Sequence, residues 1–374
     1  MFVTLRSQPK TAYNPPTTIH LQKNQNHESS NKYSWDIVWF NVFVLGYLHL
    51  AAVYGLVLVL TGNTKISTIC WGLFVGITSS MAVTGGAHRL WAHKTYKANL
   101  PLRILLATFM TMTFQNHIYE WARDHRVHHK YAETDADPHN AKRGFFFSHV
   151  GWLMVKKHKD VIEKGKTVDV SDLEQDSVVV FQRKYYAPLV LFGTFIFPML
   201  VPWYFWNESI SISWHVATVL RYVMSVNMVW CTNSAAHLYG TKPYDKNIGP
   251  TQNQMMLIIG LGEGFHNYHH TFPWDYKAAE FGNDIRNITT SMIDFFAKIG
   301  WATELKTTSP EMIRRRAFRT GDGTWDGDLT EMKRNFVEKK LDDSKEEVWG
   351  WGDKAMGRDE MREIQISNGI ICSE

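Results

Sequence analysis

The chain has 374 residues, a mean hydropathy of -0.25 and a formal net charge of +4. These averages are typical of a soluble protein of two or three domains, and the 45% of hydrophobic residues excludes a disordered chain. Three cysteines exclude a disulfide framework, and so small a net charge gives no reason to expect a nucleic-acid partner. The 17 histidines are unusual for a soluble enzyme, so the positions of histidines and apolar residues decide the class.

The chain begins with a polar segment, residues 1–34, which is rich in Asn, Thr and Pro and has no apolar core of a signal peptide. We expect it to be a disordered cytosolic tail. Four long apolar stretches follow at about residues 37–60, 66–87, 188–206 and 212–237. Since about 20 helical residues cross a hydrocarbon core, and lipid-facing backbone must pair within its own helix, four transmembrane helices are predicted.

A single apolar stretch would also fit a buried helix of a soluble core, but four stretches with aromatic ends favour a membrane protein. The shorter stretch at 100–114 predicts an amphipathic or partly buried helix at the membrane face. Lys and Arg concentrate in residues 88–186 and after residue 239, so the positive-inside rule places both termini in the cytosol. We expect a multi-pass domain over 35–320 and a charged cytosolic tail over 321–374, in which Trp325, Trp349 and Trp351 argue against complete disorder.

Nine of the histidines fall into four short groups that follow predicted spans or lie in the long cytosolic segment. They are His88 and His93; His125, His128 and His129; His237; and His266, His269 and His270. Positions i, i+3 and i+4 share a helix face, so we expect each HxxHH triplet to aim its imidazoles at one point. The pair at i and i+5 diverges on an ideal helix and converges only if the helix unwinds between them.

Buried imidazoles in such number need a common partner, and a metal cation is the partner that suits them. Nine ligands are too many for one ion, whereas two ions with four or five ligands each fit the count. The absence of nearby cysteine argues against structural zinc, and no Glu-x-x-His repeat of the soluble di-iron carboxylate proteins occurs. An all-histidine di-iron centre is the remaining interpretation, although composition alone does not separate iron from zinc.

The histidine groups stand in longer motifs: GAHRLWAH at 86–93, EWARDHRVHH at 120–129, NSAAH at 233–237 and GFHNYHH at 264–270. Over about 35–320 the chain resembles the membrane fatty acyl-CoA desaturase family, in particular the stearoyl-CoA desaturase-like enzymes of animals and the Δ9 and Δ11 enzymes of insects such as moths. The resemblance implies an all-α fold of four transmembrane helices in a mushroom-like arrangement under a cytosolic helical cap, in the endoplasmic reticulum. The cap would hold two iron ions beside a narrow acyl tunnel.

The resemblance also implies roles for individual residues. All nine histidines would be metal ligands, Asn233 would hold an ion through water, and no catalytic residue beyond these ligands is expected. The residues expected to bind the substrate are Asn41, Asn116, Arg123, Asp124, Lys156 and Lys157 around the CoA portion, and Gln115, Trp121 and Trp230 at the bend of the tunnel. Lys and Arg suit the CoA phosphates. Steps of three or four residues back from His88 reach Thr84, Ser80 and Gly76, which we expect to set the tunnel depth.

The implied reaction inserts a double bond into a saturated long-chain fatty acyl-CoA with O2 as co-substrate. The sequence has no haem, flavin or GxGxxG motif, so the two electrons would come from another protein. The resemblance implies that this protein is cytochrome b5, reduced by its NADH-dependent reductase. The Gly-Pro-Thr-Gln sequence at 249–252 is more similar to the Δ11 group than to the Δ9 groups. Two other interpretations stay open: a membrane hydroxylase or monooxygenase with the same histidine boxes, and a metal transporter, for which His49 and Arg221 are the mid-span candidates.

Overall fold

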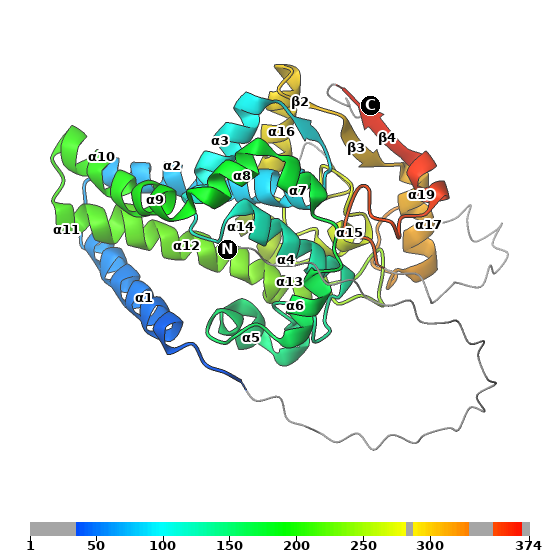
Figure 1. Cartoon of the computed structure of the whole chain (residues 1–374), viewed down its shortest axis with the longest axis horizontal. Coiled ribbons are helices and arrows are strands. Elements are labelled where there is room, and N and C mark those ends of the chain that lie inside the picture. The colour runs from blue at the N-terminus through cyan, green and yellow to red at the C-terminus, as the bar shows by residue number, and fades with distance from the viewer. Residues whose placement is uncertain (1–34, 282–286, 329–346, 369–374) are drawn as a thin grey trace, which may run out of the picture. The chain divides into compact units, whose positions relative to one another are not determined.

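A computed structural model describes residues 35–281, 287–328 and 347–368, and most of their regular structure is helical (Figure 1). The predicted tail 1–34 and two pieces of the predicted C-terminal tail, 329–346 and 369–374, lie outside the described residues. The helices and strands of the described residues all belong to one unit of the chain, Asp36–Glu374.

Among the described residues, three helices are long and apolar enough to cross a membrane, by length and composition: Trp39–Leu60, Ile66–Ala92 and Tyr186–Trp206. The first is α1 (Trp39–Leu60), the second joins α2 (Ile66–Met81) to the π-helical segment η1 (Ala82–Ala92), and the third joins α9 (Tyr186–Val190), the π-helical η4 (Leu191–Ile196) and α10 (Phe197–Trp206). They coincide with three of the four predicted spans. The second helix runs five residues further than predicted, to the histidine region.

The fourth predicted span, 212–237, is helical but is not among these three membrane candidates. It consists of α11 (Ile210–Ile212), the π-helical η5 (Ser213–Leu220), α12 (Arg221–Asn233) and α13 (Ala235–Leu238). Polar side chains lower its hydropathy, and among them Arg221 has the highest free-energy cost of placement inside a membrane. The guanidinium of Arg221 is buried and donates to the carbonyl oxygens of Met112 at 2.8 Å and Thr194 at 2.9 Å, as a paired cation inside a helix bundle would.

Shorter elements form the rest of the unit, on the side of Figure 1 away from α1 and α10. The helices are α3 (Leu100–Thr111), α4 (Ile118–Lys130), α5 (Phe145–His149), α6 (Lys159–Gly165), α7 (Ser171–Gln175), α8 (Ser177–Lys184), α14 (Gln254–Ile259), α15 (His266–Thr271), α16 (Ile288–Lys298), α17 (Pro310–Thr320) and α19 (Arg358–Glu363), with 3-10 turns η2 (Ala141–Arg143) and η3 (Gly151–Leu153). Two antiparallel pairs join β1 (Lys97–Ala98) to β2 (Ala302–Thr303) and β3 (Leu305–Thr308) to β4 (Ile364–Ser367).

Two apolar cores fix the helices that carry histidines. One core joins η1 and α4 to α3, α8 and α16. The other places α15 against α17 and the segment around Met356 and Ile364. The second core therefore includes residues of the predicted C-terminal tail, and β4 pairs with β3 from Thr308–Ile364 to Leu305–Ser367. In the described residues 347–368, the chain packs against the region that carries the histidines.

Candidate metal centre and the cavities beside it

His88 and His93 converge because their helix widens rather than unwinds, which corrects the local prediction. Segment η1 is a π-helix, and the backbone N–H of His93 donates to the carbonyl of His88 at 3.0 Å, an i to i+5 bond. A π-helical turn brings residues five apart onto one side, and such turns are frequent at functional sites. The two rings lie 4.8 Å apart between centroids.

The nine predicted histidines gather into two groups, in which His125 and His270 are half-buried and the other seven are buried. The five-histidine group contains His88, His93, His125, His129 and His269, and the four-histidine group contains His128, His237, His266 and His270. Within each group, one ligand atom from every residue lies within 4.8 Å of the others. The groups draw on η1, α4, α13 and α15, which are far apart in sequence.

The HxxHH triplets do not each aim at one point, contrary to the geometric prediction. On α4, His125 and His129 belong to the five-histidine group while His128 faces the four-histidine group. Helix α15 mirrors this division, since His269 belongs to the first group and His266 and His270 to the second. The i and i+4 pair of each triplet shares a face, and the remaining histidine lies about 100° round the helix from its neighbour.

The spacing of the ring nitrogens fits metal ligation. The Nε2 atoms of His88 and His269 lie 2.9 Å apart, those of His93 and His125 2.9 Å, those of His129 and His269 3.1 Å, and those of His237 and His266 3.0 Å. Imidazole nitrogens bound to one ion at about 2.0–2.1 Å and at right angles lie about 3 Å apart. Several lone pairs pointing at a common centre need a cation there, and the donor set consists of nitrogen ligands that suit iron or zinc.

Burial keeps these rings in the neutral form that binds metal. It lowers the pKa of the ring in His125, His129, His266, His269 and His270, with neighbouring histidines as further causes. A neutral imidazole offers one lone pair to an ion while its other nitrogen carries the proton. Because neutral rings do not repel a cation, both histidine groups can bind one.

Three histidines have their other ring nitrogen fixed by a partner that the sequence analysis did not single out. Nδ1 of His88 lies 3.1 Å from Oε2 of Glu263, and Nδ1 of His128 lies 2.9 Å from Oδ1 of Asp137. Nδ1 of His93 meets the backbone carbonyl of Trp349. Metal-binding histidines usually donate this second N–H to a carboxylate or a carbonyl, which orients the ring. Only Asp137, nine residues after His128, was recognisable by proximity in sequence.

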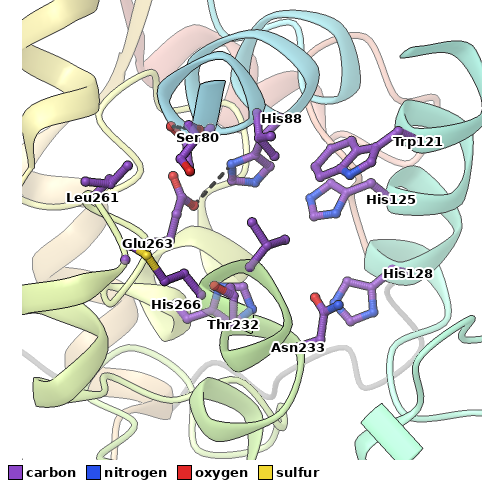
Figure 2. A pocket seen from close by; sticks show the side chains of 15 residues that line it. Ser80, His88, Trp121, His125, His128, Thr232, Asn233, Leu261, Glu263 and His266 are labelled. Atoms are coloured by element: carbon purple, nitrogen blue, oxygen red, sulfur yellow. Dashed lines mark hydrogen bonds and ion pairs between the residues drawn. The ribbon is translucent and has the colours of Figure 1, made fainter. Parts of the chain in front are cut away.

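Three cavities lie in a row past the histidines. The outer cavity, of about 290 Å³, is lined by α1, α4, α12 and the turn after α3. The metal cavity, of about 50 Å³, is lined by His88, His125, His128 and His266, and Figure 2 shows Glu263 beside His88 and Trp121 beside His125. The distal cavity, of about 270 Å³, lies between α2, η5 and α12 and is almost wholly apolar.

Neighbouring cavities share lining residues, so they follow one another. Trp121, His125, Val229 and Asn233 line both the outer and the metal cavity, and Ser80, Met228 and Leu261 line both the metal and the distal cavity. The face of the second helix predicted to set the tunnel depth lies here: Thr84 lines the metal cavity, Ser80 the joint and Gly76 the distal cavity. Asn233, the predicted water-mediated ligand, reaches the cavity that holds His128 (Figure 2).

Most of the predicted substrate-binding residues line the outer cavity: Asn41, Gln115, Asn116, Trp121, Asp124 and Trp230. Trp121 stacks on His125 with ring centroids 4.9 Å apart, so it joins this cavity to the five-histidine group. Arg123 donates to Asp124 at 2.7 Å, and Lys157 donates to Glu120 at 2.8 Å and also to Asp124.

Lys156 lies apart from this cluster. Its ammonium is exposed and contacts Asp36 at 3.3 Å. Arg123 and Lys157 therefore meet at Asp124, which lines the outer cavity, whereas Lys156 stays on the surface beside the start of α1.

Comparisons with known proteins give the family of this chain. The fatty acid desaturase family model matches residues 63–279, which include all nine histidines. An acyl-CoA Delta-9 desaturase of Acheta domesticus is 54% identical over 329 residues, 88% of this chain and 86% of that protein. A stearoyl-CoA desaturase 5 of Bos taurus is 57% identical over 77% of this chain and 85% of that protein, and an acyl-CoA Delta(11) desaturase of Spodoptera littoralis is 54% identical over 79% and 87%. This chain belongs to the fatty acid desaturase family.

Proposed function

We propose that the protein uses O2 to insert a double bond into a saturated long-chain fatty acyl-CoA, with two iron ions held by the nine histidines. The observation that carries this proposal is the row of cavities that passes directly by both histidine groups. The relatives named above act, by their names, on acyl-CoA or stearoyl-CoA. Asn233 is proposed to assist the four-histidine group through a water molecule.

The reaction removes two hydrogens from adjacent unactivated methylene groups, which no acid or base side chain achieves. A pair of bound iron ions supplies this oxidising chemistry with O2. The protein chain contributes binding, orientation and the exclusion of water. The metal cavity is small and the distal cavity is apolar, so an acyl chain threaded through both leaves little room for solvent.

The methylenes of a saturated chain are chemically alike, so the distance of each carbon from the anchored CoA portion selects the ones that react. The cluster of Arg123, Asp124 and Lys157 is proposed to anchor the CoA portion at the outer cavity. Its two cations suit phosphate oxygens, and Asp124 and Glu120 hold them in place. The exposed Lys156 adds a further positive charge near the start of α1, where it contacts Asp36. In the same region, the side-chain amide of Asn41 donates to the carbonyl of Leu153 at 2.7 Å.

The position of the new bond is proposed to be Δ11 or Δ9. The Thr251 hydroxyl donates to the carbonyls of Ala236 and Tyr239, each at 2.8 Å, and Gln252 bridges to Phe265. Residues 251 and 252 therefore hold the segments that carry His237 and His266, where a small shift would move one ion relative to the acyl chain.

The membrane arrangement is part of the same proposal. Helix 210–233 is proposed as a fourth span beside the three apolar helices, with both termini in the cytosol and the enzyme in the endoplasmic reticulum membrane. Electrons are proposed to come from cytochrome b5 and its NADH-dependent reductase. The charged surface of α17, where Arg314 is partly exposed beside Glu311, is suited to an acidic protein partner.

Expression in a desaturase-deficient yeast tests the proposal, with double-bond positions read by mass spectrometry. We expect a new monounsaturated fatty acid that disappears in the His128→Ala variant. An alcohol in place of the alkene would favour a hydroxylase. Absence of any new alkene, with iron bound and cytochrome b5 present, would refute desaturation.

A further inference from the structure

The described part of the predicted C-terminal tail reaches the candidate metal centre. Residues 349–353, Trp-Gly-Trp-Gly-Asp, form a clamp segment that lies outside the region 63–279 matched by the family model. Trp349, Gly350 and Asp353 are buried, although the surrounding sequence is highly charged. An ordinary surface tail would leave a segment of this kind in solvent.

The clamp segment holds His93 on two sides. The backbone carbonyl of Trp349 accepts from Nδ1 of His93, and the backbone N–H of Trp351 donates to the carbonyl of His93 at 2.9 Å. His93 is fully buried, and its Nε2 atom lies 2.9 Å from that of His125. The hydrogen bond at Nδ1 therefore fixes both the tautomer and the direction in which the Nε2 lone pair points, which is into the five-histidine group.

The same segment is tied to α4, which carries His125 and His129 of the five-histidine group. Oδ2 of Asp353 accepts from the backbone N–H of Trp349 at 3.0 Å, and Oδ1 of Asp353 lies 3.3 Å from the ammonium of Lys130 on α4. The guanidinium carbon of Arg126 lies 4.2 Å from the centroid of the Trp349 ring. Arg126 in turn donates to the carbonyl of Ala92. The clamp segment thus connects α4 to the end of η1.

We propose that residues 349–353 are a positioning element of the metal centre, which holds the His93 imidazole in the orientation that binds an ion in the five-histidine group. This inference rests on the proposed function, because it assumes that the nine histidines bind metal. It assigns to the C-terminal region a role in metal retention, distinct from substrate binding. The role acts through a backbone carbonyl, so the sequence alone carries no sign of it.

Gly350 offers a specific way to disturb the contact. Its φ is +153°, and a Cβ built on it would lie 2.6 Å from the carbonyl oxygen and 2.8 Å from the Cα of His93. These are backbone atoms, so in the Gly350→Ala variant the clamp segment must move away from His93. Gly352 is a matched control, since it lies in the same segment at a φ of +88° and a Cβ there meets only Lys94 Nζ, at 3.5 Å. Gly352→Ala therefore introduces backbone strain without displacing the carbonyl of Trp349.

The test measures Fe²⁺ binding to purified full-length protein, by metal content after challenge with a chelator, together with the thermal midpoint of the metal-free protein. Loss of such an outer contact weakens metal binding on the order of 10- to 100-fold. We expect Gly350→Ala to lose one of two ions at a chelator concentration that wild type and Gly352→Ala withstand. The metal-free midpoints of the two glycine variants should be similar, which separates metal positioning from a general loss of stability.

A second variant keeps the test decisive if Gly350→Ala does not fold. Asp353→Asn keeps the size of the side chain but weakens its hold on Lys130, so a smaller loss of the same ion is expected. Iron retention equal to wild type in every folded variant would overturn the clamp while leaving the proposed function intact. A wild-type protein that takes up no Fe²⁺ would overturn both.

Discussion

Ser80 stands at the joint between the metal cavity and the distal cavity, and its substitution tests whether the acyl chain passes there. Its side chain is almost fully buried and lines both cavities. Ser80→Leu replaces a small side chain by one that fills the joint. An acyl chain anchored at the outer cavity would then end beside the histidines, and its methyl end could not enter the distal cavity.

The expected magnitude follows from the apolar lining. An eighteen-carbon acyl chain has four methylenes more than a fourteen-carbon chain, and the distal cavity of about 270 Å³ has room for them. Each methylene moved from water to an apolar site contributes about 0.8 kcal/mol, so four contribute up to about 3.2 kcal/mol. Because about 1.4 kcal/mol corresponds to a factor of ten, the longer substrate is favoured up to about 200-fold in kcat/KM, and Ser80→Leu removes this preference.

The assay is a competition between the two saturated acyl-CoA substrates, with the unsaturated products separated by mass spectrometry. Gly46→Leu is the matched control, since Gly46 lies exposed on α1 and a Cβ there meets nothing within 4 Å. The control should keep the wild-type product ratio. An unchanged ratio in Ser80→Leu, with the enzyme still active, would show that the distal cavity does not hold the methyl end.

Three further predictions concern other parts of the protein. Asp137→Asn weakens the contact that orients His128, so metal retention against a chelator should fall on the order of 10- to 100-fold, as measured by metal content per chain. Lys157→Met should raise the KM for acyl-CoA at least about tenfold, since a charge-assisted hydrogen bond contributes about 1.5–3 kcal/mol, whereas Lys156→Met, on the exposed surface, should raise it less. Burial lowers the pKa of Lys306 from 10.5 to about 8, so between these pH values the unfolded chain binds one proton more than the folded protein. The free energy of unfolding of the wild type should therefore rise with pH over this range. Lys306→Met should remove this rise, as measured by thermal unfolding at several pH values.

The sequence predicted the strongest features of the fold because they depend on local patterns. Uniformly apolar stretches with uncharged interiors mark the three candidate membrane helices to within a few residues. The helix at 210–233 is harder to classify, since Arg221 finds its partners in Met112 and Thr194, which lie far away in sequence. Pairing of β4 with β3 is equally non-local, so the packing of residues 347–368 was not predictable from their charged composition.

In the site, too, the features that depend on local sequence were predictable and those that depend on tertiary packing were not. Residue type and spacing identified all nine histidines, but their division into five and four depends on how η1, α4 and α15 meet. The π-helical form of η1 also lies beyond periodicity, because the i and i+5 spacing is as compatible with an unwound helix. Glu263 and the carbonyl of Trp349 reach their histidines through tertiary packing, and a backbone carbonyl leaves no mark on the sequence at all.

The division of the histidines itself has a direct test in the neighbours His128 and His129. They are adjacent on α4, yet they belong to different groups, since one faces His237 and His266 and the other faces His269. His128→Ala and His129→Ala should therefore each retain about half of the wild-type iron, and the double variant should lose nearly all of it.

If the triplet instead converged on one ion, both single variants would lose the same ion and the double variant would lose no more than either. Metal content per chain distinguishes these outcomes without any measurement of activity.

The adjacent positions of histidines from different groups have a mechanical consequence as well. Residues 128 and 129 on α4, and again residues 269 and 270 on α15, are adjacent but belong to different groups, so neither helix can shift the histidines of one group without shifting those of the other.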